Sequence, residues 1–159
     1  MVSRGAFYGA VVVLVVLLVI SSSLALLYYT QYNQAESQNQ SYVQQLQRLG
    51  VRYSSDFLFD FGNGTREWQN GTLFQPGTNV YAATQLLTNG RINDTYYASL
   101  KEHFITAMYN IPSAGNNYWG LWAANASGWY MPSVGADDIQ VTNNSVFAWA
   151  YGANNGTSP

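Results

Sequence analysis

The chain of 159 residues contains no cysteine and few charges. Without cysteine it can form neither disulfide bonds nor a cysteine-ligated metal site. Charged residues make up 9% of the chain, whereas ordinary domains carry about 25%. Lys101 is the single lysine, so the chain has no basic patch and nucleic acid is not an expected partner. The surface must therefore be built from uncharged polar side chains and tyrosine.

Recognisable catalytic motifs are also absent. The sequence has no P-loop, no G-x-S-x-G elbow and no H-E-x-x-H pair. The single histidine, His103, lies in a strand-like segment with no obvious acid or nucleophile partner, so we interpret it as structural. The acidic residues lack the spacing of an EF-hand loop. We therefore predict no metal, no cofactor and no enzymatic activity.

One long apolar segment is present, at residues 6–29, and it carries no charge. A helix of that length spans roughly 36 Å, enough to cross a hydrocarbon core of about 30 Å with some tilt. We predict a transmembrane helix over residues 6–29 that lies in the lipid bilayer, with residues 1–5 in the cytoplasm.

The orientation follows from two observations. Arg4 is the charged side chain before the span, which by the positive-inside bias places the N-terminus in the cytoplasm and the rest outside. The chain also carries seven N-x-[ST] acceptor sites, which require an extracytoplasmic face if they are glycosylated. Asn-Gly-Thr is also good turn chemistry, which is the alternative explanation. The predicted glycosylation sites are Asn63, Asn70, Asn93, Asn125 and Asn155; Asn39 and Asn143 complete the seven, and we expect Asn143 to react less readily than Asn63 or Asn70.

Two other fates of the span stay open. Small residues at 21–25 offer positions for cleavage of a secretory signal, although the apolar run is about twice the usual length. Arg4-Gly5 before the apolar run resembles archaeal prepilin processing sites, with cleavage after Gly5. In that case the chain would be a structural subunit of a cell-surface filament.

A Gln- and Asn-rich segment, residues 30–50, follows the span and contains three heptads. We predict a helical stalk that ends at Gly50, with Asn39 at an a-type position that favours a parallel dimer. The alternatives are a lone helix that packs on its own domain and a frayed linker, and a glycan on Asn39 would be incompatible with the seam. The predicted self-association residues are Tyr32, Asn39, Tyr42, Leu46 and Leu49.

Residues 51–151 show the alternation of short strands and predict one extracellular α+β domain, followed by a flexible tail at 152–159. We expect about six strands and one helix, residues 79–87, capped by Thr78. Residues 92–100 predict a loop or a poor helix, and residues 139–141 a short strand.

Three aromatic segments follow one another in this domain. They are Tyr118 to Trp122, Gly128 to Tyr130 with the loop Val134 to Asp137, and Val146 to Tyr151. In this order they resemble the small domain family related to the C-terminal β-domain of transcobalamin, over residues 53–151. One departure is Asn144-Ser145, where the family usually has Gly-Asp. The resemblance implies a β-grasp-like fold and binding instead of catalysis. In transcobalamin that domain covers one face of a corrinoid held by a separate helical domain, which no segment here resembles.

The tryptophans divide into expected core and expected surface. Alternation along the closing strand places Trp149 in the core, and we assign Trp122 to the same core. Trp119, Trp129 and Tyr130 are then the expected exposed ligand-binding residues, suited to a sugar, a planar molecule or an extracellular protein. The sequence therefore predicts a membrane-anchored extracellular binding module, with the filament subunit as the alternative.

Overall fold

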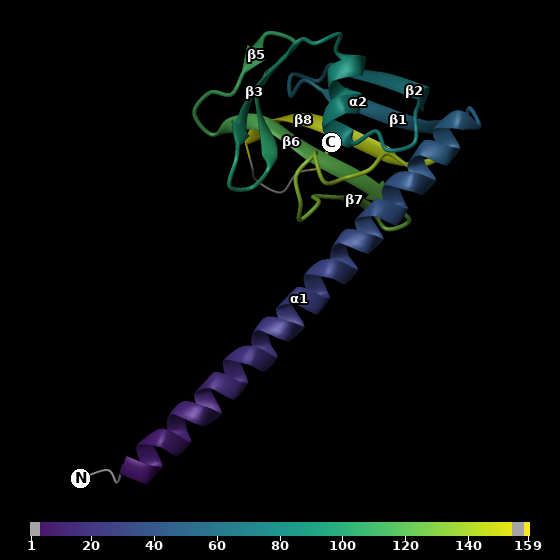
Figure 1. Ribbon diagram of the computed structural model, residues 1–159. Helices are drawn as coiled ribbons and strands as arrows, with labels where there is room; N and C mark the ends of the chain where they lie inside the picture. Colours follow the sequence, from purple (N-terminus) through teal and green to yellow (C-terminus); the bar gives the residue numbers. More distant parts are fainter. Residues whose placement is uncertain (1–3, 154–157) are drawn as a thin grey trace. The chain divides into compact units, whose positions relative to one another are not determined.

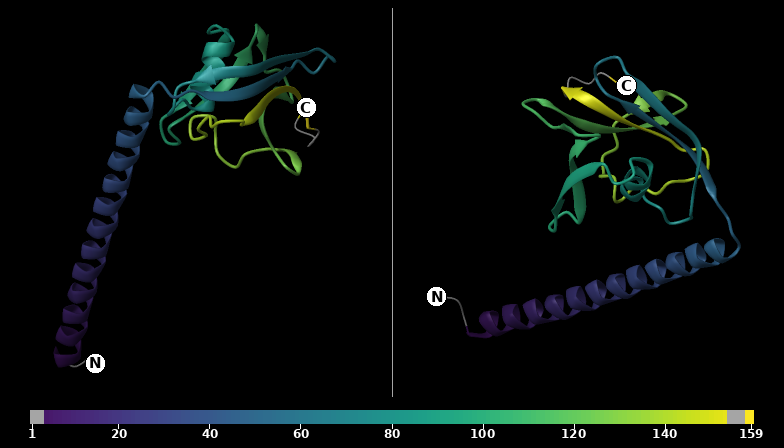
Figure 2. Two further views of the ribbon diagram at one scale, coloured as in Figure 1. Left: turned by 90° about the vertical axis from the view of Figure 1, so that its right-hand side faces the viewer. Right: turned by 90° about the horizontal axis from the view of Figure 1, so that it is seen from above.

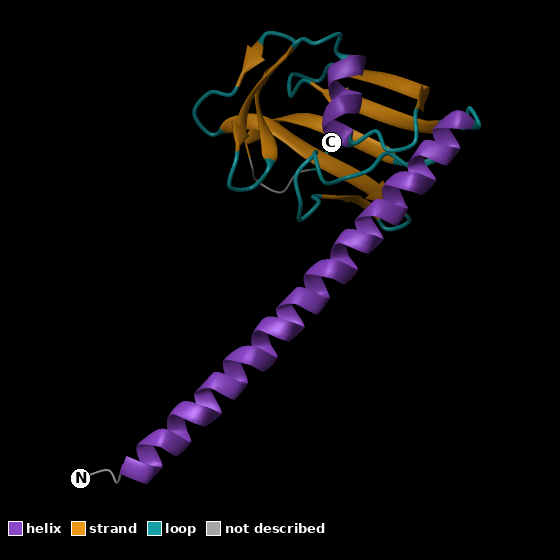
Figure 3. Ribbon diagram, in the orientation of Figure 1, coloured by secondary structure: helices purple, strands orange, loops and turns teal. Residues whose placement is uncertain are grey.

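The structure is a computed structural model that describes residues 4–153 and 158–159, with side chains from residue 13 onward. It divides into two compact units, the first ending at Gln45 and the second beginning at Leu46. Figure 1 labels the elements, Figure 2 gives two further views, and Figure 3 separates helix from strand. The α+β class predicted from the sequence is confirmed.

The first unit is formed by helix α1, Arg4–Arg48, which continues without a break into the second unit. From Val13 onward it contains one stretch long and apolar enough to cross a membrane, which is consistent with a single-pass anchor. The hydroxyls of Ser21 and Ser23 donate to the carbonyls of Leu18 and Val19 at 3.0 and 2.8 Å. Because hydrocarbon offers no partners, this internal bonding lets serines lie within an apolar span.

Gly50 ends α1, as predicted. Its φ of 70° is left-handed, its N–H donates to Gln47, and the next N–H, of Val51, donates back to Leu46. This pair of bonds is the Schellman motif, which glycine adopts without a Cβ clash. Four of the five side chains of the predicted heptad seam are exposed, with Tyr32, Tyr42 and Leu49 each more than 60% accessible, and Leu46 is partly buried. Self-association through the stalk stays a prediction.

The second unit contains two β-sheets and a short helix. The larger sheet has the order β2-β1-β8-β6-β7, and β1 runs parallel to β8 while the other neighbours are antiparallel. The smaller sheet has the order β3-β4-β5. The eight strands exceed the six or so expected because β3 and β5 were not predicted as strands. Their bounds are β1 Tyr53–Asp60, β2 Arg66–Phe74, β3 Ile92–Tyr97, β4 Glu102–Met108, β5 Ile111–Pro112, β6 Asn117–Asn125, β7 Gly128–Tyr130 and β8 Val146–Ala153.

Several local predictions were wrong. Residues 92–97 form strand β3, whose exposed side chains lack an alternating pattern; pairing with β4 holds it in place. Residues 139–141 form only an isolated bridge, between Gln140 and Asn79. The tail was predicted from residue 152, but β8 continues to Ala153, and residues 154–157 lie outside the described chain. Asn70 lies in β2 at a bulge and not in a turn.

Helix α2, Val80–Leu87, covers one face of the larger sheet, which we call the inner face (Figure 1). Its cap is Asn79, whose side chain accepts from Ala82 N–H, and not Thr78 as predicted. Because β4 also packs against this face, the main core lies between the two sheets and α2. Its largest fully buried side chains include Phe57, Phe59 and Met108.

Candidate functional site

Strand register decides which tryptophans belong to the main core. In the β6–β8 pair Trp119 lies opposite Tyr151, and Leu121 opposite Trp149. Opposed residues share a face, so Trp119 joins Trp149 on the inner face, where they are 3% and 4% exposed. The Trp119 indole N–H donates to Ile111 O at 3.0 Å. The prediction that Trp119 is exposed was therefore wrong.

Trp122 lies on the opposite, outer face of the sheet, and its assignment to the core of Trp149 was also wrong. It is opposite Ala148, one residue out of phase with Trp149, and it packs in a second cluster with Leu58 and Ala148. Trp129 of β7 packs against this cluster, half-buried. The physical reason is that side chains of a strand alternate between its two faces, and β6 carries bulky side chains on both. Only the register of β6 with β8 therefore decides which of the two faces packs against the core.

The outer face also carries Trp68, which lies opposite Leu58 and is 46% exposed. The rings of Trp68 and Trp129 lie 6.5 Å apart between centroids. Tyr130 lies opposite Ala123, a main-core residue, so it lies on the inner-face side of the sheet, where it is exposed at the edge. The structure therefore separates the three residues that the sequence grouped: Trp119 is buried, Trp129 is on the outer face, and Tyr130 is on the other.

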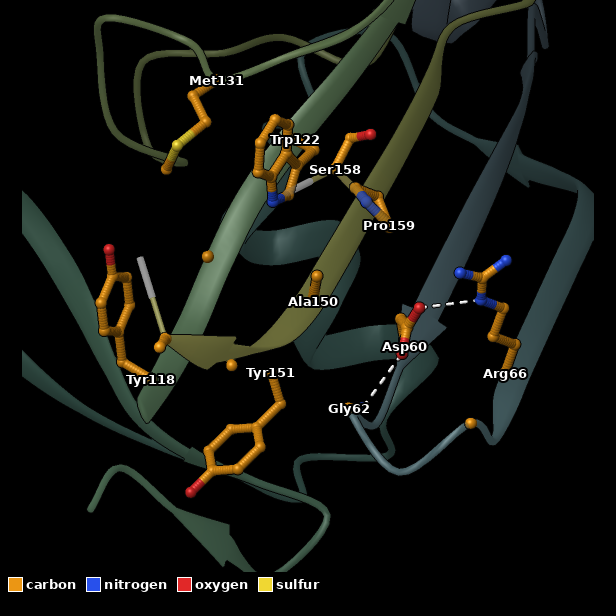
Figure 4. Close-up of a pocket in the computed structure, with 14 residues that line it drawn as sticks. Asp60, Gly62, Arg66, Tyr118, Trp122, Met131, Ala150, Tyr151, Ser158 and Pro159 are labelled. Carbon is orange, nitrogen blue, oxygen red and sulfur yellow. Dashed lines mark hydrogen bonds and ion pairs between the residues drawn. The ribbon is translucent and has the colours of Figure 1, made fainter. Parts of the chain in front are cut away.

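A cavity of about 500 Å³ lies on this outer face, beside Trp122 (Figure 4). We call it the outer-face cavity. Gly120, Ala150 and Gly152 form its floor, and because they carry at most a methyl group the sheet backbone is open to the cavity. The cavity walls come from several elements: Tyr118 and Trp122 from β6, Met131 after β7, Asp60 at the end of β1, Arg66 at the start of β2, and Ser158 and Pro159.

An ion pair forms one end of the outer-face cavity. The Asp60 carboxylate accepts from Arg66 Nε at 2.8 Å and from the Gly62 N–H at 3.0 Å. The Asp60 side chain is 13% exposed and that of Arg66 is 56% exposed, so the guanidinium faces solvent while the carboxylate holds it in place. The pair is neutral as a unit, and it places hydrogen-bond donors at the cavity margin.

A second polar cluster surrounds His103, and here the sequence interpretation was incomplete. The His103 Nδ1 lies 2.8 Å from Asp137 Oδ1, and its Nε2 lies 3.8 Å from Asp94 Oδ2. The ring of Tyr81 stacks on the imidazole at 4.0 Å. Burial, and next the Asp94 carboxylate, raise the pKa of Tyr81 to about 12. The cluster joins α2, β3, β4 and the loop that carries Asp137, so it holds the smaller sheet to the rest of the domain.

The asparagines of the acceptor sites are exposed wherever the structure describes them, and Asn155 lies outside the described residues. Asn63 and Asn125 each accept a backbone N–H two residues ahead, as asparagine does in tight turns. Asn143 instead accepts the N–H of Ser54 on β1, which ties its side chain to another strand. This tie agrees in direction with the lower reactivity expected of Asn143.

Sequence reasoning missed the outer-face cavity: it assigned Trp122 to the core, and none of its predicted ligand-binding residues, Trp119, Trp129 and Tyr130, lines the cavity. One available signal was the run of small residues at alternate positions of the closing strand, 148, 150 and 152. A strand with one bulky face and one face of Ala and Gly either packs tightly or leaves a hollow.

Comparison with known proteins supports the fold. No protein-family model and no curated protein matches the chain. Among solved structures, it is similar to haptocorrin in complex with Cbi, with a TM-score of 0.54 and 13% sequence identity over 65% of this chain. The chain spans 25% of that haptocorrin. A proposed metal binding protein from Ruminococcus gnavus ATCC 29149 is 12% identical, over 64% of this chain and 98% of its own, at a TM-score of 0.49. The match to haptocorrin shows that residues of this chain adopt a transcobalamin-like fold.

Proposed function

We propose that the chain is a membrane-anchored, extracellular, non-enzymatic binding module that holds a small ligand in its outer-face cavity. The observation that carries the proposal is the cavity itself, a hollow of about 500 Å³ walled by Tyr118, Trp122 and Met131. Ligand sites are hollows of this size, largely apolar, with a few placed polar groups. The likeness to haptocorrin, described in complex with Cbi, adds support from a binding protein of similar fold.

The non-enzymatic part of the proposal rests on where the titratable groups lie. His103, the chain's one histidine, lies among Tyr81, Asp94 and Asp137, which do not line the outer-face cavity. The carboxylate that does line it, Asp60, is bonded to Arg66 and Gly62. A general base must instead reach the proton that it takes from a substrate.

Binding is tested on the full chain in detergent, by the ¹H–¹⁵N signal of the Trp122 indole, assigned with Trp122→Phe. Glycosides, nucleosides, amino acids and a corrinoid are each titrated into the protein in separate experiments. We expect at least one compound to shift this signal to saturation. The proposal fails if no class of compound does so.

The anchor and its orientation have a separate test. The apolar part of α1, and the exposure of six acceptor asparagines, support a span with the domain outside. Protease added to intact cells should remove residues beyond the span and leave an N-terminal fragment. Glycopeptide mapping should find Asn63 or Asn70 occupied. Full protection of the domain would reverse the orientation.

The alternative, a filament subunit cleaved after Gly5, is compatible with the same helix. Helix α1 continues without a break from Arg4 to Arg48, and such a helix suits a bundle of copies as well as a single span. Mass spectrometry of the native chain distinguishes the two. A mature N-terminus at Ala6, with recovery in a sheared filament fraction, would favour the filament.

A further inference from the structure

The Trp122 indole N–H has no acceptor within the described chain, and its nitrogen stays accessible at the cavity. The N–H of Trp119 donates to Ile111 O, and that of Trp149 to Thr84 Oγ1 at 2.8 Å. Trp122 makes no such bond to any residue of 4–153 or 158–159, although it is only 9% exposed. Tryptophan can only donate, so a ligand that satisfies Trp122 must present an acceptor.

The indole nitrogen faces the outer-face cavity. A Cβ placed on Gly120 would lie 3.6 Å from Trp122 Nε1, so the nitrogen stands over the cavity floor, as Figure 4 shows for the ring. That Cβ would also be 3.9 Å from the Met131 methyl group. These are ordinary contact distances, so packing does not require glycine at position 120. The missing side chain is space that a ligand can occupy.

The other end of the cavity offers both kinds of hydrogen-bonding group. Arg66 uses Nε for Asp60, and its two terminal nitrogens make no bond within the described chain. Asp60 keeps acceptor capacity because a carboxylate has about four lone-pair positions and two are used here. A ligand group that both accepts and donates, as a hydroxyl does, therefore suits this end.

The ion pair also selects against a ligand with a full charge. A carboxylate bound to Arg66 would lie near Asp60, and a cation bound to Asp60 would lie near Arg66. Like charges at such range disfavour binding by amounts comparable to the gain from the opposite charge. The ligand that fits is uncharged, rich in oxygen, and flat enough to lie on a floor of Gly120, Ala150 and Gly152.

We infer that the outer-face cavity binds a neutral saccharide, with a ring or hydroxyl oxygen on the Trp122 N–H, hydroxyls on Asp60 and Arg66, and an apolar C–H face on the floor. This inference rests on the proposed function, because it names the ligand class of the same cavity. A cavity of about 500 Å³ lies in the ordinary range for small-ligand sites.

The test uses the full chain in a phosphocholine detergent, because detergents with sugar headgroups would compete. Methyl β-glucoside, methyl β-galactoside and N-acetylglucosamine are the neutral probes; glucuronate, a nucleoside and a corrinoid are the comparison probes. We expect a neutral saccharide to shift the Trp122 indole signal to saturation, and the signals of buried Trp119 and Trp149 to stay in place.

Matched variants then locate the site. Gly120→Val fills the floor and should abolish the shift, whereas Ala124→Val places the same side chain on the same strand face outside the cavity and should leave it unchanged. Gly152→Ala is a second blocking variant, since its Cβ would meet no atom within 4 Å and cannot disturb the fold by contact. Arg66→Gln should weaken binding about tenfold, as loss of a charged hydrogen bond does.

The outcomes separate the inference from the proposed function. A shift caused by glucuronate, the nucleoside or the corrinoid, but by no neutral saccharide, overturns the saccharide inference and leaves the binding module standing. A saccharide shift that persists in both Gly120→Val and Gly152→Ala overturns the assigned site. Failure of every probe overturns both.

Discussion

The two faces of the larger sheet use the same residue type for different purposes. On the inner face Trp119 and Trp149 are buried beneath α2 and β4, and both indole N–H groups have protein acceptors. On the outer face Trp122 borders a cavity, and its N–H has no acceptor within the described chain. Trp122 follows Trp119 by three positions along β6, so the chemical difference comes from strand register and not from composition. The comparison teaches that the inner tryptophans are committed to the core, whereas the outer one is free for the recognition role that we propose.

The largest loss of stability is expected from truncation of the tryptophans on the inner face. Trp119→Ala and Trp149→Ala should each cost about 3–5 kcal/mol of unfolding free energy, because each leaves a large cavity in a packed core. Urea unfolding followed by near-UV circular dichroism measures the loss. A Trp119→Ala variant as stable as the parent would show that Trp119 does not belong to the core.

A smaller loss tests the hydrogen bond beneath Trp149. Thr84 is fully buried and its Oγ1 accepts the Trp149 N–H while donating to Val80 O. Thr84→Val keeps the shape but leaves a buried N–H unpaired, which should cost about 1–3 kcal/mol. Thr84→Ser, which retains the oxygen, is the control and should recover part of that loss under the same urea unfolding.

Truncation of a tryptophan on the outer face should cost less stability than truncation of one on the inner face. Trp129 is half-buried and contacts the small cluster of Leu58 and Ala148, so Trp129→Ala removes less buried area and should cost about 1–2 kcal/mol. Differential scanning calorimetry should rank it well below Trp119→Ala. Equal losses from the two variants would mean that the faces do not differ in their contribution to stability.

The smallest expected effect is a loss of stability at alkaline pH that depends on Tyr81. Burial, followed by Asp94, raises the pKa of Tyr81 to about 12 from 10.0, so the folded state holds this proton longer than the unfolded state does. The resulting stability is complete below about pH 10 and is lost as pH rises to about 12. Tyr81→Phe should therefore show a shallower fall of melting temperature between these pH values. Parallel curves for the two proteins would contradict the shift.

Several features follow from local sequence alone. The uncharged run predicts the apolar half of α1, and Gly50 predicts its end because only glycine enters the left-handed region without strain. The alternation of Phe57 with Phe59, and of Phe147 with Trp149, predicts two strands whose aromatic side chains face the core, and all four lie in the main core. Each of these depends on neighbours within a few residues, which periodicity captures.

Other features depend on pairing between distant segments. Strand β3 shows no alternation and exists because β4 pairs with it, across a turn at residues 98–101. The two carboxylates beside His103 come from β3 and from a loop more than thirty residues away. The outer-face cavity needs β1, β2, β6 and β8 side by side, and no local pattern states that order.

The sequence by itself determined an apolar helix at the N-terminal end, an α+β domain after it, and a closing strand whose aromatic side chains face a core. Only the tertiary structure decided that Trp119 and not Trp122 joins that core. The physical reason is that a strand with bulky residues on both faces has two nearly equivalent settings. The register with β8, set by the whole sheet, selects between them and so decides which tryptophan is left to face the outer-face cavity.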